Sequence, residues 1–560
     1  MRQVIECVPN FSEGRDKEVI KQITDEIEKI ENVKLLDVDP GADTNRTVVT
    51  FVGSPKEVKE AAFQAVKKAS ELIDMSKHSG AHPRFGATDV CPLVPVSNIS
   101  MEETVEHARE LAERIGKELN IPIYCYENAA YEEKRQNLAN CRSGEYEGLK
   151  DRITQPEWKP DFGPAEFNAQ TGATAVGARD FLVAFNVNLN TTSLRRANAI
   201  AFDVREKGRV KREGGKITGK PVLDENGNKV WIPGTLKAVK AIGWFIDEYG
   251  VAQISMNLTN ISVTSVHEAF DETAKKAAER GIRATGSELV GLIPKQAMLD
   301  AGKYFLRKQQ RSLGVSEDEL IKIAVKSMGL DDLKPFDPKD KIIEYMMDDD
   351  NQEKLVDKNM TDFANETASE SPAPGGGSIS AYVGALGASL GTMVANLSSH
   401  KRGWDDRWEE FSMVAEKGQQ KKDELLYLVD EDTNAFNKIM DAFRLPKKTG
   451  EEKAARKEAI NEATRYASEI PYRVMKTSFE SMEVMKEMAE KGMKSSISDA
   501  GVGAICAMAA VRGAHLNVQI NTKDFEDKAF VEEMLEKAQK VNEQAQKKEK
   551  EILALVEQNM

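Results

Sequence analysis

The chain has 560 residues, of which 40% are hydrophobic and 30% charged, and its formal net charge is −14. Such a composition is typical of a soluble globular protein with several domains. The acidic balance argues against general binding of nucleic acids or anionic membranes, because both require a cationic protein face. The five cysteines are scattered without a CxxC pair, and the N-terminal residues contain no apolar signal core. These features predict a cytoplasmic protein without a disulfide framework or a structural zinc site.

The first 130 residues alternate between strand and helix patterns. Apolar alternation predicts strands at residues 3–8, 33–38, 47–52, 90–96 and 121–126, and helical spacing predicts helices at 16–30, 55–73 and 101–119. A turn at 39–43 joins the second and third strands. The β-α-β-β-α-β order is that of a ferredoxin-like sandwich, in which helices cover one face of a sheet.

A Pro-, Gly- and Trp-rich connector, residues 155–177, interrupts the pattern, which then repeats. Strands are predicted at 181–187, 241–246, 252–259 and 288–293, and helices at 192–206, 266–280 and 295–306. We therefore expect a second α/β subdomain of the same kind. Residues 208–236 are rich in Gly and Lys, which suits anion binding, but a solvated insertion is the simpler interpretation.

The second half of the chain has a different character. Residues 306–350 form a mixed helical connector, and from 353 to 560 long Ala-, Glu-, Lys-, Met- and Leu-rich runs predict a helical bundle. The predicted fold class is thus α/β plus all-α. Its parts are two ferredoxin-like α/β subdomains (1–178 and 179–325), a linker (326–352) and a helical-bundle domain (353–560).

Residues 371–400 contain no charged side chain unless His400 is protonated, and this length could span a bilayer. The prolines, glycines and hydroxyl side chains of the stretch favour a loop that enters a buried helix. No second candidate span is apparent, so we expect no membrane span.

Two of the six histidines, His78 and His82, lie in a loop-like segment at residues 75–91. Imidazole titrates near neutrality, which suits proton transfer, and loops often display reactive groups. A passive turn or surface role is the alternative for either histidine. In the preceding strand, alternation places Leu36 and Val38 on one face and turns the Asp39 side chain to the other. Asp39 could therefore orient an imidazole from the His82 loop, or it could cap the Pro-Gly turn.

The connector combines two aromatic rings, Phe162 and Phe167, with Asn168, Gln170 and several glycines. Aromatic rings can stack on a flat heteroaromatic ligand while amides bind its edge. The composition therefore indicates a site for such a ligand, although an isolated loop of this kind is a weak signal.

Five segments of the first half together resemble the glutamate formimidoyltransferase family: residues 8–15, 37–41, 79–92, 172–186 and 286–294. They cover most of residues 1–325 in the expected order. The resemblance implies transfer of a formimidoyl group from N-formimidoyl-L-glutamate to N5 of tetrahydrofolate, late in histidine degradation. It also implies that His82 is the catalytic proton-transfer residue. The attacking N5 must lose a proton and the departing glutamate nitrogen must gain one, and one imidazole can do both in turn.

The same resemblance implies that part of the connector binds folate. The matching residues are Gly163, Pro164, Ala165, Glu166, Phe167, Asn168, Ala169, Gln170, Thr171 and Gly172. Arg84 is the nearest candidate for a substrate carboxylate, because its planar fork matches that group. A structural salt bridge is an equally good interpretation of Arg84.

In the second half, Gly375, Gly376, Gly377 and Ser378 stand directly before a predicted helix. Successive amides there can form a cradle for an anion or a polar ligand, or they can simply allow a tight entry into a buried helix. The segment lacks the Gly-Lys-Ser/Thr ending of a nucleotide P-loop, so we exclude that interpretation.

Asp432 lies on the apolar stripe of another predicted helix. At 100° per residue it falls within about 60° of Leu425, Leu428, Val429, Phe436, Ile439 and Phe443. A carboxyl group in that position is either paired or has a raised pKa, as a general acid or base requires. Asp430, by contrast, points to nearly the opposite side.

With residues 442–446 and 498–501, these segments resemble the formimidoyltetrahydrofolate cyclodeaminase family. That family is helical, closes 5-formimidoyltetrahydrofolate to 5,10-methenyltetrahydrofolate and releases ammonia. The resemblance implies that Asp432 is the proton donor and acceptor. Methenyltetrahydrofolate cyclohydrolases share the helical family, so this domain alone leaves the reaction open. The fused transferase favours the cyclodeaminase, because its product is the cyclodeaminase substrate.

Taken together, the two resemblances predict a bifunctional formimidoyltransferase-cyclodeaminase, a transferase and an ammonia-lyase in one chain. Tetrahydrofolate, including its polyglutamylated forms, is the expected co-substrate, and no metal is expected. The apolar, Gly-rich helices indicate subunit packing, and the resemblance implies a homo-oligomer. Two other hypotheses are a transferase fused to a cyclohydrolase-type domain, which would release no ammonia, and a non-catalytic folate-binding scaffold. The presence of His82 and Asp432 in their motifs argues against the scaffold.

Overall fold

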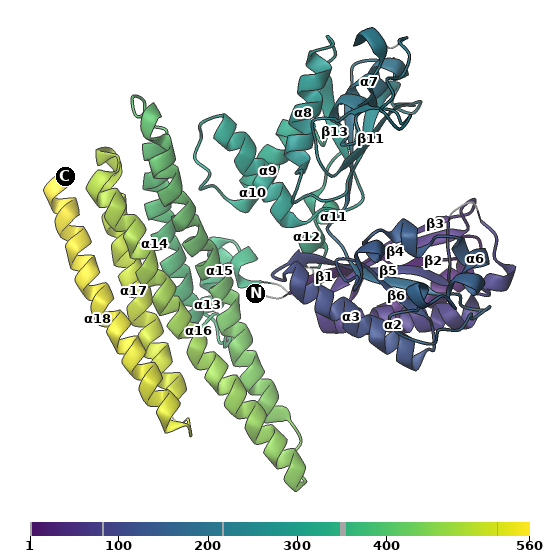
Figure 1. Cartoon of the computed structure of the whole chain (residues 1–560). Coiled ribbons are helices and arrows are strands. Elements are labelled where there is room, and N and C mark those ends of the chain that lie inside the picture. Colours follow the sequence, from purple (N-terminus) through teal and green to yellow (C-terminus); the bar gives the residue numbers. More distant parts are fainter. Residues whose placement is uncertain (1–2, 81–82, 216–217, 348–353, 524) are drawn as a thin grey trace. The chain divides into compact units, whose positions relative to one another are not determined.

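The computed structural model describes residues 3–80, 83–215, 218–347, 354–523 and 525–560. Residue contacts divide the chain into two compact units. Figure 1 labels their helices and strands. The first unit comprises Met1–Ala301 and Ala324–Asp349, and the second, here called the helical unit, comprises Gly302–Ile323 and Asp350–Met560. The predicted α/β region followed by a helical region is therefore confirmed at this level.

Seven of the described strands form the first sheet. They are β1 (Val4–Cys7), β2 (Asn10–Phe11), β3 (Lys34–Gly41), β4 (Arg46–Gly53), β5 (Thr88–Ser97), β6 (Ile123–Glu127) and β7 (Thr174–Ala178). The order across the sheet is β3-β4-β1/β2-β5-β7-β6, since β1 and β2 both pair with β4 and β5. β7 runs parallel to both of its neighbours, β5 and β6, and the other pairs are antiparallel.

Helices cover both faces of the β5-β7-β6 part of this sheet. Ile123 and Cys125 of β6 pack in the cluster formed with α1 (Lys17–Glu28), α2 (Pro55–Leu72) and α3 (Met101–Glu118). Tyr124 and Tyr126 point the other way, into a cluster with Cys141 and Leu149. That second face is covered by the short helices α4 (Glu133–Gln136), α5 (Leu138–Cys141) and α6 (Glu145–Arg152).

Three local predictions for this sheet were wrong. Most of β7 lies within the stretch predicted as an irregular connector; its residues are all buried, so no alternation marks it as a strand. β3 has an irregular register at Leu36, and as a result Leu35 and Val38 pack together on the core. The strand also continues to Gly41, which places the turn at residues 42–45 instead of 39–43.

The second sheet of the first unit has the order β11-β12-β8-β13, with antiparallel neighbours. Its strands are β8 (Val183–Leu189), β11 (Val239–Ile246), β12 (Val251–Leu258) and β13 (Ala284–Val290), and its helices are α7 (Leu194–Val204) and α8 (Val266–Ala278). The predicted insertion holds the small pair β9 (Arg209–Val210) and β10 (Trp231–Ile232), and most of its described residues are exposed. Helices α9 (Lys295–Lys308), α10 (Glu317–Met328), α11 (Pro338–Lys341) and α12 (Ile343–Met347) follow.

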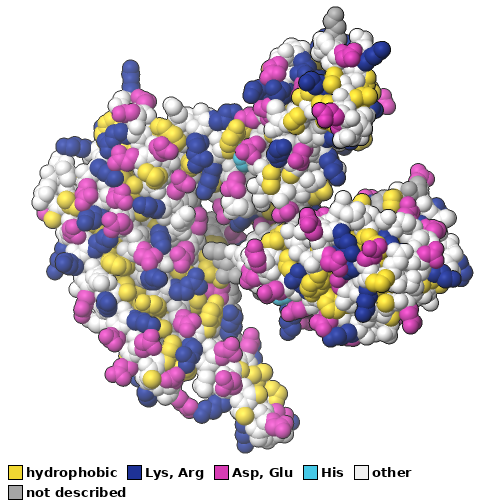
Figure 2. All heavy atoms as spheres, in the orientation of Figure 1, with side chains coloured by type: hydrophobic (Ala, Val, Ile, Leu, Met, Phe, Trp, Pro, Cys, Tyr) yellow, Lys and Arg dark blue, Asp and Glu magenta, His cyan; other side chains and the backbone are white. Residues whose placement is uncertain are grey.

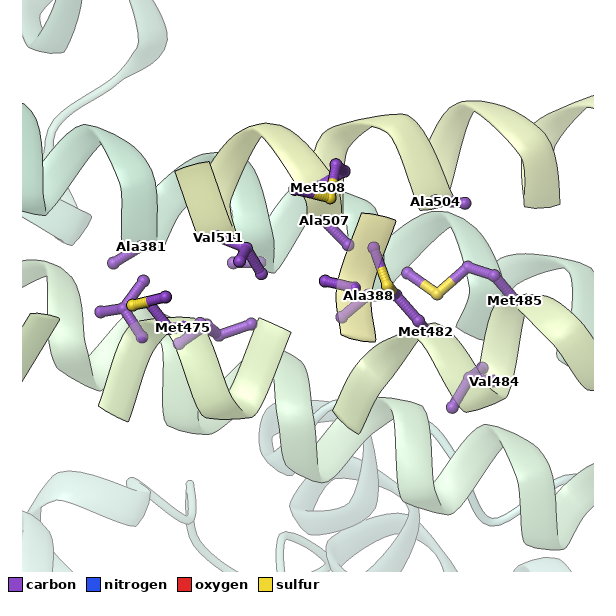
Figure 3. Packing of buried hydrophobic residues seen from close by; sticks show 14 of the residues in the cluster. Ala381, Ala388, Met475, Met482, Val484, Met485, Ala504, Ala507, Met508 and Val511 are labelled. Carbon is purple, nitrogen blue, oxygen red and sulfur yellow. The ribbon is translucent and has the colours of Figure 1, made fainter. Parts of the chain in front are cut away.

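The helical unit contains α13 (Met360–Thr367), α14 (Gly376–Ser399), α15 (Trp408–Arg444), α16 (Gly450–Lys491), α17 (Ile497–Thr522) and α18 (Lys528–Asn559). The long helices pack side by side around a core rich in Ala, Met and Val (Figure 3). In that view, Ala381 and Ala388 of α14 face Met475 and Met482 of α16 and Ala507 of α17. Small side chains on α14 and α17 allow these helices to approach each other closely.

Among the described residues, two helices are long and apolar enough to span a membrane by length and composition alone. They are Gly376–Ser399 and Lys494–Thr522, and 61% and 56% of their apolar windows are buried inside the structure. The expectation of a single candidate was wrong, because Asp499 and Arg512 interrupt the uncharged run in the second one. Burial of this extent is what core helices of a bundle show, and the absence of a membrane span stays a prediction.

Residues 302–323, here called the docking segment, complete the helical unit. The Leu313 N–H donates to Ser412 Oγ at 2.9 Å, and Asn396 Nδ2 donates to the Gly314 carbonyl at 2.8 Å. Gly314 also packs against Ala415 of α15. The predicted boundary at residue 325 assigns this segment to the second α/β subdomain instead.

Candidate functional sites

The loop that carries His78 is held by the turn between β3 and β4. Asn45 Nδ2 donates to the Ser79 carbonyl at 3.0 Å, and the Asn45 carbonyl lies 2.9 Å from His78 Nε2. A Cβ atom on Gly80 would lie 2.2 Å from the Thr44 carbonyl oxygen, so only glycine allows the loop to approach the turn this closely. His82, the predicted proton-transfer residue, falls outside the described residues. The turn therefore positions the segment that leads to it.

Both ring nitrogens of His78 have hydrogen-bond partners. Arg84 Nε–H donates to His78 Nδ1 at 3.2 Å, so the ring proton is on Nε2, which donates to the Asn45 carbonyl. An imidazole held in this way serves to fix the loop. The geometry thus favours a supporting role for His78.

The Arg84 guanidinium is buried and pairs with two glutamates of α6. Its Nη2 lies 2.7 Å from Glu147 Oε1, and its Nη1 lies 3.2 Å from Glu145 Oε2. The hydrogen bond from Arg84 lowers the pKa of Glu147 below its ordinary value. In this structure Arg84 makes structural ion pairs, and its binding of a substrate carboxylate stays a prediction. Such binding requires the exposed Glu147 side chain to move away from the Arg84 guanidinium.

These groups line an open cavity of about 550 Å³, formed by His78, Ser79, Gly80, Arg84, Gly144, Glu145 and Glu147. The sequence interpretation missed both glutamates. They lie about sixty residues beyond Arg84, and no spacing rule connects them to it.

Asp89, which follows the His82 loop, is fully buried. Its Oδ1 accepts the Phe85 N–H at 3.1 Å, and its carboxylate is paired with Arg142. Burial raises the pKa of Asp89, and the charge of Arg142 opposes that rise. Asp89 and Arg142 therefore anchor the downstream end of the loop, a role that the sequence interpretation did not assign.

The predicted folate-binding connector packs beside the same loop. The Gln170 carbonyl accepts the Met75 N–H at 2.9 Å, and Asn168 Oδ1 accepts the N–H groups of Gln170 and Thr171. The Tyr146 hydroxyl donates to the Ala169 carbonyl at 2.6 Å. The structure thus brings residues 163–172 together with the histidine loop and α6. Contact of this segment with folate stays a prediction.

Asp39 is exposed and lies within β3, opposite Val48. Since β3 continues to Gly41, Asp39 lies in the strand and not at the turn that follows it. The alternative that Asp39 caps this turn is therefore wrong. The predicted role of Asp39 in orienting His82 stays a prediction, because His82 is outside the described residues.

The second site is at the beginning of α14. Gly375 is the N-cap of this helix, and Ser378 Oγ in its first turn donates to Asp432 Oδ2 at 3.2 Å. A Cβ atom on Gly377 would lie 2.1 Å from Asp432 Oδ1. The carboxyl group of α15 therefore lies directly against the N-terminal turn of α14. Two segments that the sequence analysis treated separately meet in one site.

The surroundings of Asp432 favour its protonated form. Burial raises the pKa of Asp432, and hydrogen bonds from the Ser378 side chain and backbone oppose this rise. Within the described parts of the chain, no cation forms an ion pair with this carboxyl group. Asp432 thus keeps its proton to a higher pH than an ordinary aspartate, and the direction of this pKa shift suits a proton donor.

The neighbouring carboxylates have structural partners instead. Asp430 accepts the Leu355 N–H at 2.6 Å, and Glu431 accepts a hydrogen bond from the Tyr466 hydroxyl. Two further polar residues belong to the Asp432 site and were not predicted. Thr433 Oγ1 lies 3.4 Å from Ser378 Oγ, and a Cβ atom on Gly376 would lie 3.6 Å from the Asn517 amide.

The apolar stripe around Asp432 is only partly buried. Leu425, Leu428 and Val429 lie in the core, as expected, whereas Phe436 is 44% exposed and Phe443 is 50% exposed. Beyond Asp432 the stripe therefore reaches the surface of the unit.

Within the described residues, no group of three or more His, Cys, Asp and Glu side chains has an arrangement that could hold a metal ion. The described arrangement at the Asp432 site offers proton transfer and hydrogen bonding.

Family models match nearly the whole chain. The N-terminal subdomain of the formiminotransferase domain matches residues 4–179, and the formiminotransferase domain matches residues 184–348. The model described as formiminotransferase-cyclodeaminase matches residues 359–540.

Curated relatives agree with these matches. The chain is 42% identical to formimidoyltransferase-cyclodeaminase of Mus musculus over 533 residues, which are 95% of each protein. It is also 42% identical to formimidoyltransferase-cyclodeaminase of Gallus gallus, covering 100% of this chain and 99% of the relative. A methenyltetrahydrofolate cyclohydrolase of Methylorubrum extorquens is 40% identical over 173 residues, 31% of this chain and 83% of that protein. The chain belongs to the formimidoyltransferase-cyclodeaminase family.

Proposed function

We propose that the chain transfers the formimidoyl group of N-formimidoyl-L-glutamate to tetrahydrofolate and then converts the product to 5,10-methenyltetrahydrofolate with release of ammonia. The full-length relatives carry both activities in their name. The observation that carries the proposal is the Asp432 carboxyl group, buried against Gly377 and Ser378 with a raised pKa.

In the first step, N5 of tetrahydrofolate attacks the amidine carbon, and the bond from this carbon to the glutamate nitrogen breaks. The attacking nitrogen loses a proton and the departing nitrogen gains one, and His82 is proposed to carry both protons in turn. The Asn45 turn and the His78–Arg84 pair would hold the loop in place during this exchange. Residues 163–172 are proposed to bind the folate, with Arg84 and Asp39 as further substrate contacts.

In the second step, N10 of the folate attacks the carbon of the protonated amidine, N5–CH=NH2⁺, and the amidine nitrogen leaves as ammonia. The protonated Asp432 can give its proton to the departing nitrogen, and its carboxylate can then take the proton that N10 loses. The N-terminal turn of α14, Gly375 to Ser378, is proposed to contact the folate while it holds Asp432.

A cyclohydrolase-type helical unit is the second candidate, because one relative of this part of the chain is named a methenyltetrahydrofolate cyclohydrolase. A chain with that activity would act on methenyltetrahydrofolate without releasing ammonia. The transferase half favours the cyclodeaminase, since its product is 5-formimidoyltetrahydrofolate. Tetrahydrofolate is then a co-substrate, and neither step as written involves a metal.

A coupled assay tests the proposal. The purified chain with N-formimidoyl-L-glutamate and tetrahydrofolate should release glutamate, release ammonia and produce the methenyl-folate absorbance in sequence. His82→Ala should stop glutamate release while ammonia release from added 5-formimidoyltetrahydrofolate continues. No ammonia from that compound would overturn the cyclodeaminase assignment, and unchanged transfer in His82→Ala would overturn the role of His82.

We also propose that the chain is a homo-oligomer that associates through α14 and α17. Leu386 and Met393 on α14 and Val502 and Ile505 on α17 are exposed apolar side chains on two helices that pack together. Exposed apolar patches of this kind are typical of association surfaces. Light scattering should give a mass that is a multiple of 62.1 kDa. Val502→Asp with Ile505→Asp should lower this mass, whereas Met413→Asp, at an exposed position on α15, should not. A mass of one chain for the unaltered protein would contradict the proposal.

Two finer assignments complete the proposal. The free thiols of all five cysteines support a cytoplasmic location. The orders β3-β4-β1/β2-β5 and β11-β12-β8-β13 support ferredoxin-like subdomains, since each has the β-α-β-β-α-β connectivity.

A further inference from the structure

A cavity of the helical unit lies along the hairpin of α15 and α16 and has a volume of about 560 Å³. Four cationic side chains line one part of it: Lys447, Lys453, Arg456 and Lys457. In the remaining part the lining is uncharged and includes Ile460, Thr464, Ile520 and Asn521. The cavity therefore has a cationic end and a neutral end.

The register of the hairpin shows which end is near Asp432. The Tyr466 hydroxyl donates to Glu431, next to Asp432, and Arg456 donates to the Phe443 carbonyl at 3.0 Å. Thr464 of α16 is therefore at the level of Asp432, and the cationic residues are at the level of Phe443 and the hairpin tip. On α17, Asn517 faces Gly376 and Asn521, one turn later on the same face, lines the cavity. The neutral end thus lies toward Asp432 and the cationic end away from it.

Most of the cationic charge in the cavity is not neutralised. Glu526 pairs with Lys457 at 2.8 Å, and it is the one acidic residue among the lining residues described here. Within the described structure, Lys447 and Lys453 form no ion pair, and Arg456 donates only to a carbonyl group. In a chain of net charge −14, this excess of positive charge is suited to an anionic ligand. Figure 2 shows basic, acidic and hydrophobic side chains mixed over the visible face.

The dimensions match one particular ligand. Phe443 lies three turns beyond Asp432 on the same face of α15, or about 16 Å along the helix axis. That span is comparable with an extended folate measured from its pterin ring to its glutamate. Phe436, between these two points, and Phe443, at the far one, are exposed and offer apolar surface to flat rings.

We propose that the cationic end of this cavity binds the glutamate carboxylates of 5-formimidoyltetrahydrofolate while the pterin ring lies at Asp432. The inference rests on the proposed cyclodeaminase function and assigns the specificity of that same site. Arg456 and Lys453 are the principal carboxylate contacts, Phe443 supports the benzoyl ring, and Glu526 competes with the ligand for Lys457.

The test compares two substrates that differ only in the tail: 5-formimidoyltetrahydrofolate and 5-formimidoyltetrahydropteroate, which lacks the glutamate. In Lys453→Gln/Arg456→Gln, the KM for the folate, measured by ammonia release, should rise about tenfold or more, because charge-assisted contacts are lost. The kcat for the folate and both constants for the pteroate should remain unchanged. Lys448→Gln removes a charge in the same segment outside the cavity lining and should leave all constants unchanged. Glu526→Gln should lower the KM for the folate alone.

Equal effects on both substrates, or no change in the KM for the folate, would overturn the inference. If the unaltered chain releases no ammonia, the proposed function fails separately. The tail site is then decided by binding of 5-formyltetrahydrofolate and its pteroate analogue in calorimetry. The double variant should weaken binding of 5-formyltetrahydrofolate at one of the two proposed folate sites and leave binding of the pteroate analogue unchanged. Unchanged binding of 5-formyltetrahydrofolate would refute the tail site.

Discussion

Asp432→Asn is expected to reduce the rate of ammonia release by a factor of about 10²–10⁴, while transfer of the formimidoyl group continues. Asparagine has nearly the same shape and can still accept the hydrogen bond from Ser378 Oγ, but it cannot donate a proton to the departing nitrogen. Ammonia production and glutamate release, followed in the same sample, measure the two steps separately. Equal loss of both activities would indicate misfolding, and undiminished ammonia release would refute the assignment of Asp432.

The same variant should be more stable than the unaltered chain above neutral pH. Burial raises the pKa of Asp432 in the folded state, so ionising it there costs stability. This cost is absent below the ordinary carboxyl pKa, grows as pH rises through the interval up to the raised value, and is complete above it. Asparagine does not ionise, so Asp432→Asn should melt at a higher temperature at pH 8, with little difference at pH 4. A thermal scan at the two pH values measures this, and a lower melting temperature at pH 8 would show that the ionised carboxylate is well stabilised.

Gly377→Ala is expected to destabilise the helical unit by about 1–3 kcal/mol, as overpacking commonly does. Its Cβ atom would lie 2.1 Å from Asp432 Oδ1 and 2.4 Å from Asp432 Cγ, so the carboxyl group must move. Ammonia release should fall about 10²-fold, because misplacement of a catalytic group by an ångström has an effect of that size. Urea denaturation and the ammonia assay measure the two effects.

Gly376→Ala is the matched control. Its Cβ atom would meet only the Asn517 amide at 3.6 Å, an ordinary contact, so the stability of the helical unit should be nearly unchanged. A second comparison isolates the clash: in an Asp432→Ala background, Gly377→Ala should lose most of its destabilising effect. If the two alanine variants behave alike, the close contact between Gly377 and Asp432 is not what limits the site.

Local patterns predicted the longer helices of the first unit, α1, α2, α3, α7, α8 and α9, within a few residues, because their signals are local. In α1, Asp16 caps the first turn and Ile20, Ile23 and Ile27 repeat at helical spacing, so the boundaries can be read from the residues. β7 could not be found this way. A parallel strand covered on both faces shows no alternation, and its partners β5 and β6 are distant in sequence.

The candidate sites also combine features that local patterns predict with contacts that depend on how distant segments pack. Helical periodicity placed Asp432 on an apolar stripe, and composition singled out Gly377 and Ser378 as a helix entry. That these residues touch depends on how α14 packs on α15, which no local pattern encodes. The glutamates paired with Arg84 and the Asp89–Arg142 pair were missed for the same reason. Charged residues on a loop and on a short helix acquire partners only in the folded chain.

The docking segment bears on where the chain can be divided. The formiminotransferase match extends to residue 348, yet residues 302–323 pack in the helical unit. The chain therefore passes into that unit, returns, and passes into it again. Expression of the helical unit from residue 354 onward would remove the Leu313 N–H from Ser412 Oγ and the Gly314 carbonyl from the Asn396 amide. The two activities differ in chemistry, but they cannot be assigned to two polypeptides that do not overlap. Residues 302–323 belong to the formiminotransferase domain by sequence and to the helical unit by contact, so each separate polypeptide would have to include them.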